Sequence, residues 1–191
     1  MKSLTVRKIA VIGMLTALII VLGATGLGIM RLPGLSIGIT ILHIPVIVGA
    51  ILEGPLVGAF TGLLFGAWSI LDKVLRPSPT GFVFFNPLVS VLPRILIGIV
   101  AYYSYILFKK RRFESFGIAI GAILATLTNT VGVLGMIYLL FAERYMQIIE
   151  QPASNALAFF AAVAVKNGVP EAIASAILTP IIIVGIRKIR K

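Results

Sequence analysis

The chain contains no cysteine, a single histidine and only six acidic residues. Without cysteine it cannot form disulfides, iron–sulfur clusters or thiolate zinc sites, and one histidine leaves almost nothing else to hold a metal. The sequence also lacks the HExxH, GxSxG and P-loop motifs, so it encodes neither ATP hydrolysis nor a familiar intramembrane protease. We therefore expect no cofactor, no metal site and no enzymatic activity.

Charged residues of either sign are scarce, at 12% of 191 residues, whereas 59% are hydrophobic and the mean hydropathy is +1.11. A soluble domain carries roughly 25% charged residues. The net charge of +11 would suit nucleic acid only if the basic residues gathered on a soluble face, but they lie between long apolar runs. The composition predicts an all-α integral membrane protein that forms a single domain over residues 1–191.

The apolar runs predict six transmembrane helices, at residues 9–28, 42–52, 56–71, 87–108, 116–141 and 155–186. The first has the roughly 20 residues that are needed to cross about 30 Å of hydrocarbon. The stretches 72–85 and 143–154 are polar or rich in proline and are predicted to be exposed loops.

The second segment is too short to cross a bilayer. As a helix, residues 42–52 would rise roughly 17 Å, about half of the hydrocarbon core. The preceding stretch, Arg31–Thr40, alternates apolar with small or polar side chains, which is typical of loop or short extended structure. Non-helical backbone survives at membrane depth only when it is buried in protein or lines a cavity. We therefore expect this loop to fold inward and to help wall a pocket.

Glycines at positions 54, 58, 62 and 66 accompany the third segment. Four-residue spacing places them on one face of a helix, where a neighbouring backbone can approach closely. This face is predicted to be a site of tight helix packing.

The distribution of basic residues predicts that both termini are cytoplasmic. With six spans, the cytoplasmic segments hold 11 of the 17 basic residues: Lys2, Arg7, Lys8, the four at 109–112, Arg187, Lys188, Arg190 and Lys191. The outer loops hold only Arg31, Lys73, Arg76 and Arg144.

Two basic residues, Arg94 and Lys166, fall within predicted spans, and Glu171 follows Lys166 in the last one. An intramembrane charge is unfavourable unless it faces protein or water, so each is a candidate functional residue. The alternative is that one of the two basic residues pairs with Glu171 and only braces the bundle. With polar residues at similar depth, the candidate substrate-binding residues are Thr40, His43, Asn86, Arg94, Asn129, Lys166 and Asn167. For His43, a structural hydrogen bond to a neighbouring loop is the other interpretation.

The chain resembles the S-components, the membrane-embedded substrate-binding subunits of energy-coupling factor (ECF) vitamin transporters. The resemblance covers nearly the whole sequence and rests on IAVIGMLTALIIVLG, HIPVIVGAILEGPLVGAFTGLLFG and VLPRILIGIVAYY. The first helix of this family carries two alanines four residues apart that contact the transmembrane coupling protein. Here Gly13 and Ala17 have that spacing, with Ala10 on the same face. Glycine replaces the first alanine and keeps the small size that the contact requires.

The resemblance implies a cell-membrane subunit that binds a vitamin or its precursor near the outer face, under the loop between the first two segments. It then topples in the membrane to release the vitamin inward. The implied partners are the ECF transmembrane coupling protein and two cytoplasmic ATPases. The HIPVIVGA and PRILIG stretches look most like the pantothenate branch. Pyridoxine, hydroxymethylpyrimidine, folate and cobalamin are the alternative substrates.

Pantothenate is a carboxylate with an amide and two hydroxyls, which suits one cation and several hydrogen-bonding groups in a largely dry pocket. Either Arg94 or Lys166 would supply that cation. A flat pyrimidine or pyridine ring would instead stack on Trp68, Phe84 or Tyr138, although these aromatics also fit an interfacial belt.

Two other classes of protein remain as alternatives. A membrane enzyme acting on lipid or isoprenoid substrates needs clusters of carboxylates or histidines, and the chain offers none. A structural scaffold without a ligand would leave unexplained the polar and charged residues at matched depth in the last three spans.

Overall fold

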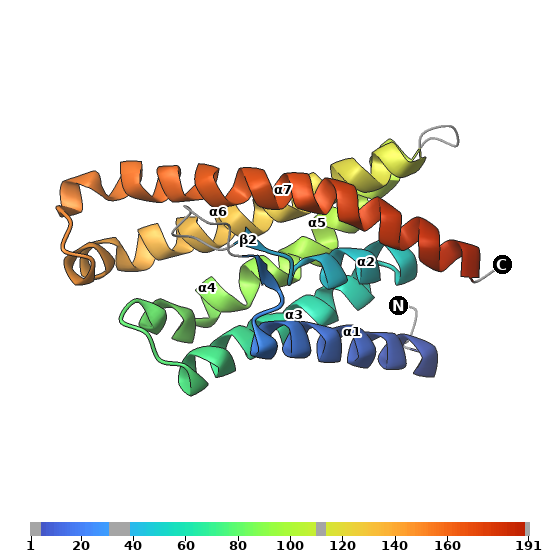
Figure 1. Ribbon diagram of the computed structural model, residues 1–191, viewed down its shortest axis with the longest axis horizontal. Coiled ribbons are helices and arrows are strands. Elements are labelled where there is room, and N and C mark those ends of the chain that lie inside the picture. The colour runs from blue at the N-terminus through green and yellow to red at the C-terminus, as the bar shows by residue number, and fades with distance from the viewer. Residues whose placement is uncertain (1–4, 31–38, 110–113, 190–191) are drawn as a thin grey trace.

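The computed structural model describes residues 5–30, 39–109 and 114–189. Over these ranges the chain is a helical bundle with one small pair of strands (Figure 1). Five helical segments are long and apolar enough to cross a membrane, and a shorter apolar helix accompanies them. The helices are α1 (Val6–Thr25), α2 (Ile44–Glu53), α3 (Pro55–Leu75), α4 (Pro87–Ser90), α5 (Leu92–Phe108), α6 (Glu114–Ile148) and α7 (Ala156–Ile189), with α4 and α5 forming one segment. The predicted all-α membrane fold is confirmed.

Helix α2 lies in the centre of the bundle and has the half length that the sequence predicts. Every residue from Ile44 to Ile51 is buried, because helices α1, α3, α5, α6 and α7 all contact α2. A helix that is apolar on all sides is typical of a protein core or of a membrane interior. Gly54 ends α2 with φ 105°, a conformation that favours glycine, and Pro55 begins α3.

Helices α3 and α5 cross at very short range. A Cβ atom on Gly62 would lie 2.1 Å from the main-chain oxygen of Arg94, and one on Gly98 would lie 2.3 Å from the carbonyl carbon of Gly58. Only hydrogen fits at such a contact, which confirms the predicted glycine face of α3. The crossing also holds the first turn of α5, and with it Arg94, against α3.

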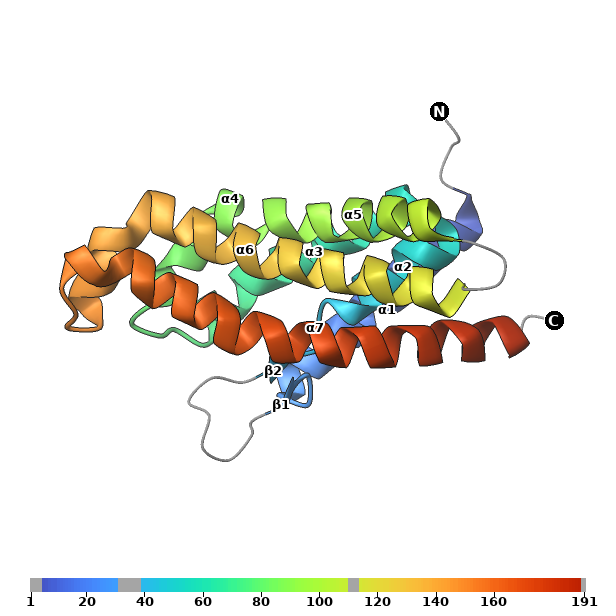
Figure 2. The same cartoon turned by 90° about the horizontal axis from the view of Figure 1, so that it is seen from above.

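The strands β1 (Ile29–Met30) and β2 (Ile39–Thr40) form a short antiparallel pair that follows α1. Figure 2 shows this pair on one flank of the bundle, beside α1 and α7. The extended structure predicted before α2 is therefore confirmed at Ile39 and Thr40. The rest of the predicted inward-folding loop, residues 31–38, lies outside the described residues.

Two of the loops predicted from the sequence are partly wrong. Helix α6 continues to Ile148, so the loop predicted at 143–154 begins later. The helix continues because Tyr145 and Met146 extend its buried face and pack in the same cluster as Phe159 and Phe160 of α7. The loop predicted at 72–85 is shortened by the end of α3 and by the 3-10 helix η1 (Gly81–Phe85). A second 3-10 helix, η2 (Ala153–Asn155), precedes α7.

The predicted fourth span is broken near its start. Asn86 caps α4 by accepting a hydrogen bond from the Leu88 N–H at 2.9 Å. Helix α5 then begins at Leu92 with Pro93 in its first turn, where a missing N–H does no harm.

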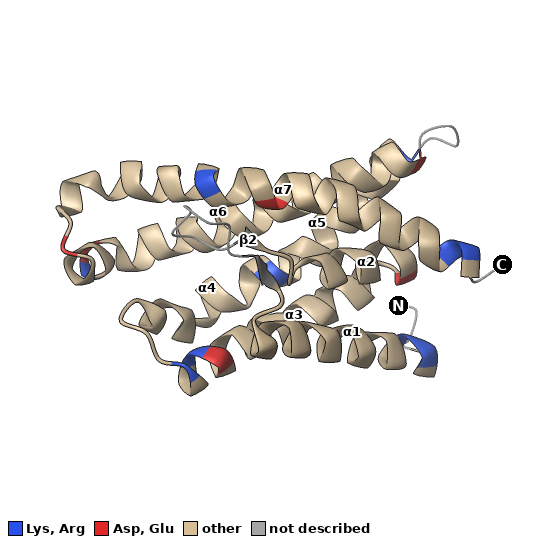
Figure 3. Cartoon of the chain, viewed as in Figure 1, with Lys and Arg blue, Asp and Glu red and all other residues tan. Residues whose placement is uncertain are grey.

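The first turn of α1 and the last turn of α7 lie at the same end of the bundle (Figure 1). Charged residues gather mostly near the helix ends, with few along their middles (Figure 3). At the end that carries both termini, Arg7 pairs with Glu53 at 3.0 Å, and Arg187 pairs with Glu114. The chain is therefore a multi-pass bundle whose apolar flanks match a lipid environment.

Candidate functional site

Two adjoining chambers lie where β2 meets α5 and α6. The larger has a volume of about 410 Å³ and is closed by α6 and α7. The smaller has a volume of about 190 Å³ and is closed by α1 and α3. Thr40 of β2, Phe84 of η1, Arg94 of α5 and Asn129 of α6 line both chambers. These four residues form the shared wall of the two chambers.

Arg94 is a buried cation at the shared wall. Its side chain is 7% exposed, and its guanidinium carbon lies 5.6 Å from the ring centroid of Phe65 and 5.8 Å from that of Phe84. One terminal nitrogen donates to the Val89 carbonyl, whereas Nε is buried and has no partner among the described residues. No carboxylate in the described part of the chain forms a salt bridge with it. Arg94 thus retains hydrogen-bonding capacity that suits an anion.

Glu171 is a buried carboxylate that lines only the larger chamber. Its Oε1 accepts a hydrogen bond of 2.9 Å from the backbone N–H of Thr40, a residue of β2. The contact ties the strand pair to α7 at the edge of the cavity. A bracing ion pair between Glu171 and either Arg94 or Lys166 is not formed among the described residues.

Polar amides complete an otherwise mainly apolar lining. Asn129 of α6 faces both chambers, its Oδ1 is buried without a partner among the described residues, and Asn167 of α7 faces the larger chamber. The apolar part of the larger chamber comes from Val133, Leu134, Ile137, Phe159 and Val163. Small-molecule sites typically enclose roughly 300–1,000 Å³ and have few polar groups on an apolar wall. The larger chamber fits this description.

Four of the seven predicted substrate-binding residues therefore meet at one place: Thr40, Arg94, Asn129 and Asn167. The other three do not line either chamber. His43 is buried between α2 and α6 with its Nε2 3.0 Å from Thr126 Oγ1, and Asn86 caps α4. Lys166 is exposed on α7.

Several lining residues were missed at the level of sequence. Thr130 lies next to Asn129 and one turn after Thr126, so two threonines four residues apart on an apolar helix were the available signal. Tyr145 was missed because its segment was predicted to be a loop. Thr80 lies in a segment that was correctly predicted to be irregular, and nothing in its sequence context marks it.

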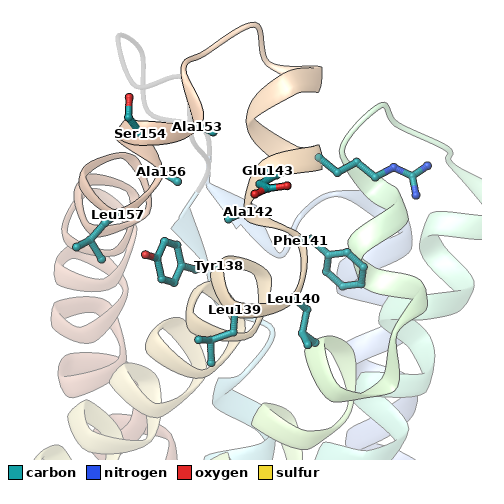
Figure 4. A pocket seen from close by; sticks show the side chains of 11 residues that line it. Tyr138, Leu139, Leu140, Phe141, Ala142, Glu143, Ala153, Ser154, Ala156 and Leu157 are labelled. Atoms are coloured by element: carbon teal, nitrogen blue, oxygen red, sulfur yellow. The ribbon is translucent and has the colours of Figure 1, made fainter.

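A third cavity, of about 580 Å³, lies at the far end of α6 and α7 (Figure 4). Figure 4 shows Tyr138, Leu139 and Leu157 around it, with Glu143 at its edge. It is larger than either chamber, but its charged residues are exposed, and the guanidinium carbon of Arg144 lies over the ring of Phe82, 4.5 Å from its centroid. We therefore place the candidate site at the two chambers, where buried polar groups converge.

The predicted partner-contact residues Ala10, Gly13 and Ala17 are all exposed on α1. A Cβ atom on Gly13 would meet nothing within 4 Å. Helix α1 is also the least buried of the five spanning segments. This face of α1 is therefore free to receive a neighbouring helix.

A multi-pass helical bundle that encloses a mostly apolar cavity around one buried cation is a membrane protein that binds a small polar molecule. Comparison with known proteins identifies the family within this class. Residues 7–183 match the family described as "ECF transporter, substrate-specific component", and the chain belongs to this family. The predicted S-component identity is confirmed, and the chain is a substrate-binding component of a transporter that works with other ECF components.

Two relatives carry a substrate in their names. The pantothenic acid transporter PanT of Lactococcus lactis subsp. cremoris (strain MG1363) is 28% identical over 204 aligned residues, which cover 100% of this chain and 98% of the relative. The pantothenate transporter PanT of Leuconostoc mesenteroides subsp. mesenteroides is 30% identical over 143 residues, which cover 73% of this chain and 70% of the relative.

Proposed function

We propose that this protein captures pantothenate at the outer face of the cell membrane for ATP-driven uptake by an ECF transporter. The observation that carries the proposal is Arg94, a buried cation at the wall of the larger chamber whose Nε has no partner among the described residues. Such a group favours a ligand that brings a negative charge. The names of the two relatives support pantothenate as that ligand.

The charges at the site orient the ligand. Its carboxylate would lie on the guanidinium of Arg94 at the shared wall, turned away from Glu171, whose negative charge would repel it. The hydroxyl end would lie in the larger chamber, where Glu171 and Asn167 accept its hydrogen bonds. The Oδ1 of Asn129, which has no partner among the described residues, would accept a bond from the amide N–H.

The remaining features agree with an S-component that works in a complex. The exposed small-residue face of α1 (Ala10, Gly13, Ala17) would bind the transmembrane coupling protein, which connects to two cytoplasmic ATPases. The N-terminal end of α1 and the C-terminal end of α7 would both face the cytoplasm, in keeping with the excess of basic residues there.

The test is a calorimetric titration of the purified protein with pantothenate, with pantothenol and with a panel of ring-shaped vitamins. In pantothenol a neutral hydroxymethyl group replaces the carboxylate. We expect pantothenate to bind and pantothenol to bind at least about tenfold more weakly, because the buried charge would then lack its partner. Equal affinity for both molecules would exclude a charge contact. Binding of only a pyridine or pyrimidine vitamin would favour stacking on Phe84 and Trp68, which line the smaller chamber.

A further inference from the structure

The smaller chamber contains a second cation, Lys73, in the last turn of α3. The Lys73 ammonium lies 5.9 Å from the ring centroid of Phe84, and the Arg94 guanidinium lies 5.8 Å from the same centroid. The two charges are therefore no farther apart than these two distances added together. The side chain of Lys73 is 30% exposed, whereas Arg94 is buried. The ring of Phe84 thus contacts both the partly exposed cation Lys73 and the buried cation Arg94 at the shared wall.

Of the two basic residues at the end of α3, Lys73 and Arg76, only Lys73 lines the smaller chamber. Asp72 pairs with Lys73 at 3.1 Å and with Arg76 at 3.8 Å, so its negative charge is shared between two basic groups. Arg76 does not line the chamber, and it donates to the main-chain oxygens of Gly23 and Ala24 at the end of α1. Arg76 is therefore held at the end of α1, while Lys73 faces the cavity.

The two chambers differ in the charge that an approaching anion would meet. The smaller chamber is lined by Lys73, Arg94 and the doubly paired Asp72. The larger chamber has Arg94 but also Glu171, whose carboxylate has no salt-bridge partner among the described residues. Charges of one sign in a cleft with low-dielectric walls focus the field and raise the association rate of an opposite charge. The smaller chamber is thus the more favourable route for an anion.

We propose that the smaller chamber is the vestibule through which the substrate reaches its site, and that Lys73 draws the substrate carboxylate toward Arg94. This inference rests on the proposed function, since it requires an anionic substrate. The carboxylate first meets Lys73, passes along the edge of Phe84 and then reaches the guanidinium of Arg94. Lys73 therefore governs the association rate, whereas Arg94 governs the dissociation rate.

The test measures association and dissociation rates of pantothenate by stopped-flow fluorescence on the full-length protein in lipid nanodiscs, at several salt concentrations. We expect Lys73→Met to lower the association rate about threefold or more, to change the dissociation rate less than about twofold, and to flatten the salt dependence. Lys73→Arg keeps the charge and should restore the association rate. Arg144→Gln is the matched control, because it removes a positive charge from a residue that lines neither chamber.

Three results would overturn the proposal that the smaller chamber is the entry vestibule. One is a wild-type association rate and salt dependence in Lys73→Met. Another is an equal decrease in Arg144→Gln, which would indicate only the overall field of the protein. The third is a dissociation rate raised as strongly as by Arg94→Met, which would make Lys73 a part of the binding site itself. In each of these three cases the proposed function would still hold, provided that the wild-type protein binds pantothenate. If the wild-type protein fails to bind pantothenate, the proposed function falls and the vestibule with it.

Discussion

Replacing Arg94 with methionine tests the anionic substrate most directly, because this side chain is the buried cation of both chambers. Methionine is unbranched and reaches as far as the Nε position of Arg94, and its sulfur can pack on the rings of Phe65 and Phe84 that now surround the guanidinium. Among the described residues no carboxylate forms a salt bridge with Arg94, so its removal breaks no direct ion pair, although it takes away a positive charge that acts on the buried Glu171. The hydrogen bond to the Val89 carbonyl is lost, which costs about 1–3 kcal/mol at most. The variant should therefore still fold.

The effect on ligand binding should be larger than the effect on folding. Truncating one partner of a buried, hydrogen-bonded charge pair typically costs about 2–5 kcal/mol of binding free energy. At about 1.4 kcal/mol for each factor of ten, the Kd for pantothenate should rise by roughly 30-fold or more. Titration calorimetry measures this change, and a thermal unfolding curve without ligand checks the fold.

The comparison with Lys166→Met makes the test selective. Lys166 is the other basic residue within a predicted span, but it is exposed on α7 and lines neither chamber. Its replacement should leave the Kd within about twofold of the wild-type value. Wild-type affinity in Arg94→Met would refute the reasoning, and a neutral ring-shaped vitamin on Trp68 and Phe84 would then be the better interpretation. Adding Glu171→Gln to Arg94→Met should leave binding weak, whereas restored stability would reveal a bracing pair.

Gly13→Leu should abolish uptake by cells but leave the Kd of the isolated subunit unchanged, because a Cβ there meets nothing within 4 Å; loss of both would place the residue in internal packing. Gly62→Ala should lower the Tm by roughly 2–10 °C, since its Cβ would lie 2.1 Å from a main-chain oxygen of α5. Gly135→Ala should leave the Tm unchanged, because a Cβ atom there would meet nothing within 4 Å. An equal decrease in the Tm of both variants would contradict the packing argument. Glu171→Ala removes the acceptor of the Thr40 N–H and should weaken binding, measured by calorimetry, by about 1–3 kcal/mol. Glu171→Gln keeps an acceptor oxygen and should lose less binding free energy than Glu171→Ala. Equal losses would argue against a role for the hydrogen bond from the Thr40 N–H.

The order and the lengths of the helices could be predicted because a bilayer leaves few options. Backbone groups in lipid must pair within their own segment, so that a long apolar run is almost necessarily a helix. The half-length α2 was predicted at 42–52 and lies at Ile44–Glu53 for the same reason. The prediction failed at the C-terminal end of α6, where Glu143 and Arg144 suggested a loop. There the aromatic packing of Tyr145 against α7, which involves residues distant in sequence, extends the helix.

The sequence by itself determined that the protein lies in the membrane, that α2 is too short to span it, and that the few charges within its spans require an explanation. It did not distinguish Arg94 from Lys166, because both are basic residues in apolar helices. Only the tertiary structure shows that Arg94 lines the chambers and Lys166 does not, since the direction of a side chain depends on how its helix is rotated against its neighbours. The contact between Gly62 and the backbone of Arg94 sets that rotation for α5 and turns Arg94 into the cavity, whereas α7 carries Lys166 on its exposed face. The same packing brings Thr40 to Glu171, which are 131 residues apart in the chain. No local pattern in the sequence encodes a contact of that range.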